Sequence, residues 1–131
     1  MNLAAFSGTA KGTTLANKAG QVARRLNTVG RCFAGAAEAI NGVFGATVWG
    51  ASAYMAAGQL AANSKFTEKS ISASQLGSLP AGAIVVWGKT SASPHGHISI
   101  ALGNGQEASD HVSNQMTSLR GYTNSRVFMP K

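Results

Sequence analysis

The chain has few of the residues that mark several common classes of protein. Of its 131 residues, four are acidic and one is cysteine, and charged residues make up 11%. A single cysteine cannot form an intramolecular disulfide. No apolar run reaches the ~20 residues that cross a bilayer, so we expect no transmembrane segment. Residues 1–8 lack a basic stretch followed by an apolar one, so we expect no signal peptide.

Several ligand-binding signatures are also missing. The three histidines and one cysteine lack the spacing of a structural zinc site, and no glycine-rich phosphate loop of the P-loop or Rossmann type is present. Zinc-finger, helix-turn-helix and RNA-recognition signatures are absent too. We therefore expect no metal, no cofactor and no nucleic-acid partner.

What remains is a basic, moderately apolar chain. Hydrophobic residues make up 44%, and the net charge is +7. This composition predicts one globular domain over residues 1–131, with 1–9 as a loose arm and nothing that demands more than a monomer. The charge favours anionic partners, such as a carboxylate-rich cell wall, unless it is simply a solvated basic helix face.

The hydrophobic periodicity changes along the chain, from helical spacing to strand alternation. Apolar residues at helical spacing predict helices over 10–28, 32–44 and 52–63, the last with Ser52 as N-cap. Alternation and turn residues then predict strands over 83–87, 96–102, 106–110 and 126–130, with a hairpin turn at 103–105. Helices followed by an antiparallel meander indicate an α+β domain.

Cys32 opens the second predicted helix, and His97 lies on a predicted strand. A helix N-terminus favours the thiolate form of a cysteine, and a histidine can accept the thiol proton. This is how papain-like hydrolases build a nucleophile, so we predict Cys32 as nucleophile and His97 as general base. The alternatives are a small buried cysteine and a structural histidine. His95 is a weaker candidate for the base, because its loop is expected to be exposed.

A third residue should accept a hydrogen bond from the far nitrogen of His97. The strand that follows the 103–105 turn passes beside His97, and Asp110 is the preferred candidate. Its rivals are Glu107, Ser109 and His111, and the register of the strand decides among them.

Other parts of the site follow less directly. Backbone N–H groups near Cys32 would form the oxyanion hole. Trp49, Ser52 and Tyr54 would line a substrate groove if the third helix begins beside Cys32, although an aromatic residue there is more often part of the core. Trp87, in an apolar strand, is predicted to be buried.

Three segments together resemble the peptidoglycan amidases of the NlpC and CHAP types. They are Leu79-Pro80-Ala81-Gly82 before a buried strand, Gly96-His97-Ile98 at the start of the next, and Gly30-Arg31-Cys32-Phe33-Ala34, which is similar to a Gly-x-Cys-Ala segment of phage-linked and secretion-linked members. Glu107-Ala108-Ser109-Asp110-His111 resembles the strand that follows. Three positions depart from the NlpC pattern: Arg31 and Phe33 flank the cysteine where that pattern has Asp-Cys-Ser, and Ala83 replaces an acid.

The resemblance implies a papain-like fold in which Cys32, His97 and Asp110 cleave peptide bonds in peptidoglycan stems or cross-links. It further implies a type VI secretion effector or a phage lysis enzyme, made without a signal peptide and acting in the periplasm or cell wall of a target cell. An effector would have an immunity protein that blocks its active site. Two other hypotheses stay open: a cysteine protease that acts on a protein, and a basic cell-wall-binding module without catalysis.

Overall fold

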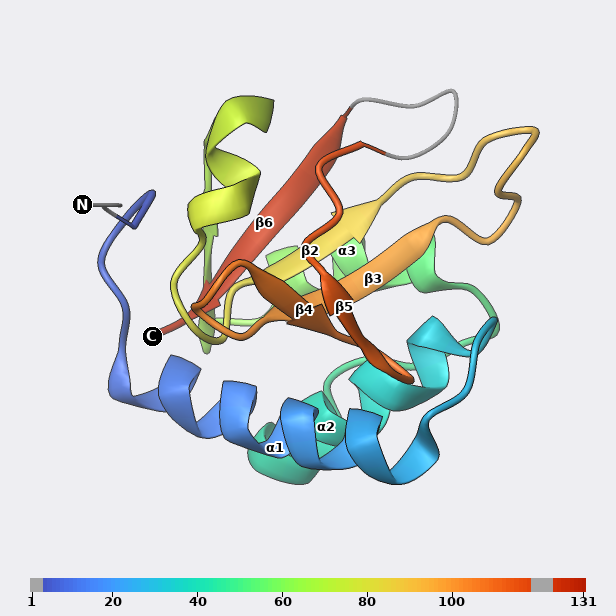
Figure 1. Cartoon of the computed structure of the whole chain (residues 1–131), viewed down its shortest axis with the longest axis horizontal. Helices are drawn as coiled ribbons and strands as arrows, with labels where there is room; N and C mark the ends of the chain where they lie inside the picture. Colours follow the sequence, from blue (N-terminus) through green and yellow to red (C-terminus); the bar gives the residue numbers. More distant parts are fainter. Residues whose placement is uncertain (1–3, 119–123) are drawn as a thin grey trace.

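In the part of the chain that the structure describes, the fold combines three α-helices, two short 3-10 helices and six strands. It is seen in a computed structural model that describes residues 4–118 and 124–131 (Figure 1). The helices are α1 (Ala10–Leu26), α2 (Cys32–Phe44), η1 (Ala53–Met55), α3 (Ala56–Ala61) and η2 (Ala73–Ser78). The strands are β1 (Phe66–Lys69), β2 (Ile84–Trp87), β3 (His97–Ala101), β4 (Gln106–Ala108), β5 (Val112–Asn114) and β6 (Ser125–Pro130).

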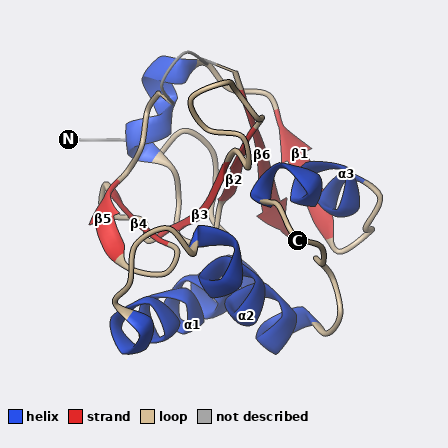
Figure 2. Ribbon diagram, turned by 90° about the vertical axis from the view of Figure 1, so that its right-hand side faces the viewer, coloured by secondary structure: helices blue, strands red, loops and turns tan. Residues whose placement is uncertain are grey.

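The six strands form one antiparallel sheet in the order β1-β6-β2-β3-β4-β5. Strands β2 to β5 follow one another as a meander, and β6 and β1 extend the sheet on the other side of β2. Helices α1 and α2 lie side by side against one face of the sheet (Figure 2). The predicted α+β architecture, with N-terminal helices on a small antiparallel sheet, is confirmed.

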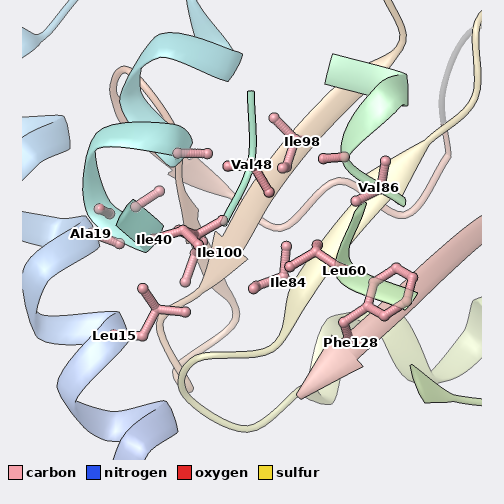
Figure 3. Packing of buried hydrophobic residues seen from close by; sticks show 14 of the residues in the cluster. Leu15, Ala19, Ile40, Val48, Leu60, Ile84, Val86, Ile98, Ile100 and Phe128 are labelled. Atoms are coloured by element: carbon pink, nitrogen blue, oxygen red, sulfur yellow. The ribbon is translucent and has the colours of Figure 1, made fainter. Parts of the chain in front are cut away.

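The main core lies between this face of the sheet and the helices. Alternate strand residues, Ile84 and Val86 on β2 and Ile98 and Ile100 on β3, meet Leu15 of α1, Ile40 of α2 and Leu60 of α3 (Figure 3). Each of these side chains is almost completely buried. Such burial stabilises the fold by about 1.5–3 kcal/mol for each large aliphatic side chain.

Other residues of β2, and Met129 of β6, point to the opposite face of the sheet. There Val85, Trp87 and Met129 pack with Leu76 of η2 and with Phe6. The predicted burial of Trp87 is confirmed, since none of its surface is exposed. Within the expected N-terminal arm, Phe6 packs on this cluster and the amide of Ala5 donates to the carbonyl of Ser78, whereas residues 1–3 lie outside the described part of the chain.

The ends of α1 follow from local chemistry. Thr9 caps the helix, its hydroxyl accepting a hydrogen bond from the amide of Gly12 at 2.9 Å. Asn27 adopts a left-handed conformation with φ of 46°, and it therefore ends the helix after Leu26, two residues before the predicted end.

Some elements differ from the sequence prediction. The predicted helix over 52–63 consists of η1 followed by the short helix α3, and the predicted strand over 106–110 ends at Ala108. Strands β1 and β5 were not predicted; both are short and carry exposed polar residues, so neither shows a clear alternation of apolar residues.

Candidate active site

Cys32 is the first residue of α2, as the sequence predicts, and its side chain is partly exposed. The N-cap residue is Arg31, whose side chain makes no capping hydrogen bond. The first amides of an α-helix have no acceptor within the helix, and here no N-cap side chain covers them. The start of α2 thus presents a thiol together with backbone donors.

His97, the first residue of β3, links Cys32 to a carboxylate. Its Nε2 atom lies 2.8 Å from Oε2 of Glu107, and the thiol of Cys32 is close enough to influence its protonation. Burial alone lowers the pKa of His97, but the hydrogen bonds and negative charges of Cys32 and Glu107 outweigh it and raise the pKa to about 9. With this raised pKa, His97 is an imidazolium beside the Cys32 sulfur at neutral pH.

Glu107 on β4 is held through both carboxylate oxygens. While Oε2 accepts from His97, Oε1 accepts from the backbone amide of Met116 at 2.7 Å and from Nε2 of Gln115 at 3.0 Å. The side chain of Glu107 is only 3% exposed. A buried carboxylate with fixed partners can hold one tautomer and one orientation of the imidazole.

The carboxylate on His97 thus belongs to Glu107, one of the predicted rivals, and not to Asp110, the preferred candidate. The strand register explains the difference. Ala101 pairs with Glu107 across β3 and β4, so Glu107 lies on the sheet face that Ala101 shares with His97. Asp110 lies beyond the end of β4, in the connection to β5.

Asp110 instead binds the loop that precedes the cysteine. Its Oδ2 atom accepts from the amide of Arg31 at 2.8 Å and from the hydroxyl of Thr28 at 3.1 Å. Its Oδ1 atom accepts from Ser109 Oγ at 3.2 Å and from His111 Nδ1 at 2.9 Å. Although burial raises the pKa of Asp110, these donors outweigh it and the pKa lies below its usual range. The two remaining rivals, Ser109 and His111, therefore contact Asp110.

Helix α2 also approaches the β4–β5 connection directly. A Cβ atom on Gly35 would lie 2.1 Å from the carbonyl oxygen of Ser109 and 2.7 Å from the amide nitrogen of Asp110. Only glycine permits this contact without a shift of the backbone. Gly35 and Asp110 together fix the start of α2 against the sheet.

A cleft of about 550 Å³ opens beside the cysteine. Its walls include Arg31, Cys32, Phe33, Val48, Trp49 and His95. Trp49 is 64% exposed, so it belongs to the groove and not to the core. His95 is exposed, as predicted, and its Nδ1 atom lies 2.6 Å from Ser52 Oγ. Tyr54 lies outside this cleft, where its ring contacts the ammonium group of Lys89.

The arrangement has the parts needed for acyl transfer by a cysteine: a thiol, a base oriented by an acid, backbone donors and an open cleft. The described residues contain no group of three or more His, Cys, Asp or Glu side chains that could hold a metal ion. Within the same residues, no helix is long and apolar enough to span a membrane.

The chain folds like a chain of a type VI effector–immunity complex. The native complex Tae3–Tai3 from Ralstonia pickettii contains a chain that matches with a TM-score of 0.73 and 22% identity, over 92% of this chain and 98% of that one. The selenomethionine form of the complex matches with a TM-score of 0.68 and 24% identity, over 88% and 98% of the two chains. No family model and no curated protein sequence matches.

The likeness to the Tae3–Tai3 chain covers almost the whole of both chains, and it confirms the predicted papain-like fold. At this level of identity the likeness concerns the fold.

Proposed function

We propose that this protein is a cysteine amidase that cleaves peptide bonds in peptidoglycan stems or cross-links, and that it acts as an antibacterial type VI effector. The observation that carries the proposal is the hydrogen bond between His97 and the buried Glu107, with Cys32 beside His97 at the first residue of a helix. The fold shared with a type VI effector–immunity complex supports the biological setting.

The proposed reaction begins with attack of the Cys32 thiolate on the carbonyl carbon of the amide. The amides at the start of α2 stabilise the oxyanion that forms, because no N-cap side chain occupies them. The His97 imidazolium then donates its proton to the leaving amine as the C–N bond breaks, which leaves a thioester on Cys32. His97 next accepts a proton from water, and the hydroxide attacks the thioester. The C–S bond then breaks, which releases the acid product and restores the Cys32 thiolate beside the His97 imidazolium.

Glu107 and Asp110 support this sequence in different ways. Glu107 keeps Nε2–H of His97 directed at the carboxylate, so Nδ1 is the nitrogen that exchanges a proton with the thiol. Asp110 is a positioning residue, which fixes the loop before Cys32 through the amide of Arg31 and the hydroxyl of Thr28. The net charge of +7 would favour the anionic cell wall.

The setting also predicts a partner. If the protein is an effector, an immunity protein should cover the cleft beside Cys32, where Trp49 offers an exposed aromatic anchor. Binding of this kind would block the substrate without any change in the catalytic groups.

Expression in a Gram-negative host tests the site of action and the role of the cysteine together. The wild-type chain with a cleavable export signal should lyse the cells, whereas the same chain without the signal should be tolerated. The exported Cys32→Ala protein should be harmless at an equal periplasmic level. Lysis by the exported Cys32→Ala protein, or toxicity only from the cytoplasm, would overturn the proposal.

A further inference from the structure

His95 is an exposed side chain that the structure nevertheless holds in one orientation. Its Nδ1 atom lies 2.6 Å from the hydroxyl of Ser52, and Ser52 is buried. Ser52 occupies the N-cap position of η1 but makes no capping hydrogen bond, since its hydroxyl binds His95 instead. Ordering an exposed side chain costs conformational entropy. The hydrogen bond to Ser52 offsets this cost and gives the exposed imidazole a preferred orientation.

The backbone around His95 is fixed as well. Its carbonyl accepts a hydrogen bond from the amide of Tyr54 at 3.1 Å, which ties the β2–β3 loop to η1. The next residue, Gly96, has φ of +69°, and a Cβ atom there would lie 2.2 Å from the carbonyl oxygen of Trp87. The loop thus places His95 at the wall of the cleft that contains Cys32, two residues before the catalytic histidine.

The charge along the described walls of this cleft is positive. Among the described residues that line it, Arg31 is the charged side chain and no aspartate or glutamate is present. The uncapped start of α2 adds the positive end of a helix dipole. With Nδ1 of His95 bound to Ser52, the Nε2 atom is free to donate into the cleft when the serine hydroxyl donates to Nδ1. The walls therefore suit an anion.

We infer that His95 and Arg31 form a subsite for a free carboxylate of the substrate beside the scissile amide. This inference rests on the proposed function, and it defines the substrate class further: stem peptides with a free carboxylate are preferred over stems in which that carboxylate is a primary amide. Ser52 acts as a positioning residue that holds the ring of His95, and Trp49 supplies an apolar wall for the rest of the peptide.

Binding to an inactive protein tests the subsite without relying on hydrolysis. The probes are the stem tetrapeptide L-Ala-γ-D-Glu-meso-diaminopimelate-D-Ala and two matched peptides, one with the D-Glu α-carboxylate and one with the terminal D-Ala carboxylate as a primary amide. Dissociation constants would be measured by calorimetry with the Cys32→Ala protein. One of the two amidated peptides should bind about tenfold more weakly than the free acid.

Three variants in the Cys32→Ala background assign the effect to residues. His95→Gln and Arg31→Gln should each remove most of the difference between acid and amide, and Ser52→Ala should reduce it less. Arg24→Gln is the matched control, because it removes the same charge from the exposed surface of α1, away from this cleft, and should keep the difference.

The outcomes separate the two proposals. Equal binding of all three peptides, or an acid preference that survives both His95→Gln and Arg31→Gln, would overturn the carboxylate subsite even if the wild type cleaves peptidoglycan. A preference for the acid that depends on His95 would support the subsite even if the wild type releases no fragments, a result that would count against the proposed reaction alone. Imidazole NMR signals of His95 that shift with the acid and not with the amide would add direct support.

Discussion

The imidazole of His97 donates to Oε2 of Glu107 across 2.8 Å, between the first residue of β3 and the middle residue of β4. The same carboxylate is fixed by the amide of Met116 through its other oxygen. His97 is thereby held between a buried acid and the cysteine at the start of α2. This relationship determines which protonation state the histidine has at neutral pH.

Replacement of Glu107 by Gln should lower the catalytic efficiency and shift its pH dependence. The imidazolium donates the proton to the leaving amine, so activity should fall as pH rises through the pKa of His97, which is about 9. Without the negative charge of Glu107 that pKa is lower, and the alkaline limb should move to lower pH. We expect kcat/KM at pH 7 to fall roughly 10²- to 10⁴-fold.

The measurement is a pH profile of kcat/KM on a synthetic stem peptide for the wild type and Glu107→Gln. The control is Gln115→Ala, which removes a neutral donor from the other carboxylate oxygen and should leave the alkaline limb close to its original position. An unchanged limb in Glu107→Gln would mean that this carboxylate does not set the charge of His97.

Asp110→Asn should affect stability more than the protonation of His97. Its carboxylate is buried and binds the loop before Cys32, so the variant should unfold about 1–3 kcal/mol more easily at pH 7. The pKa of Asp110 is lowered in the folded state, from an ordinary value of 3.8. Its contribution is therefore present above that value and is lost as pH falls through the folded pKa.

Urea unfolding at pH 7 and at pH 3 checks this expectation, because the two proteins should differ less at the lower pH. Activity of Asp110→Asn should decline while its alkaline limb stays near that of the wild type. If the alkaline fall of kcat/KM moved to another pH in Asp110→Asn while stability stayed the same, Asp110 and not Glu107 would be the carboxylate that controls the charge of His97.

Gly35→Ala should displace the start of α2. The new methyl group would meet the backbone of Ser109 and Asp110, which cannot rotate away, so the helix has to shift. We expect a loss of stability of about 1–3 kcal/mol together with a lower kcat. Gly58→Ala is the matched control, because a Cβ atom at this helical position meets nothing within 4 Å and should stabilise the protein by about 0.5–1 kcal/mol.

Thermal unfolding and kcat of both glycine variants make the comparison. If Gly35→Ala were as stable and as active as Gly58→Ala, the close approach of α2 to the β4–β5 connection would have no part in positioning Cys32.

Much of the site could be predicted from the sequence because its parts belong to strongly patterned elements. Cys32 follows a glycine break and opens an apolar helical stripe, and His97 opens an alternating strand between two glycine turns. Local patterns of this kind do not depend on tertiary contacts. The helix and the strand were therefore placed to within a residue at their starts.

The carboxylate that binds His97 was harder to predict, although the register of β3 and β4 could have identified it. Across the turn at 103–105, each odd-numbered residue of β3 pairs with an odd-numbered residue of β4, as Ala101 pairs with Glu107. Paired residues point to the same face of the sheet. Counting through the turn in this way puts Glu107 on the face of His97. The binding role of Asp110 could not be predicted, because it depends on how α2 docks against a connection far away in the sequence.

Digestion of purified sacculi by the wild type and by Cys32→Ala, with the soluble fragments identified by mass spectrometry, tests directly whether Cys32 cleaves peptidoglycan. We expect new peptide-containing fragments from the wild type alone, with masses that correspond to hydrolysis of one amide in the stem or cross-link. Fragments from both proteins would contradict Cys32 as the nucleophile. No fragments from an otherwise folded wild type would contradict peptidoglycan as the substrate.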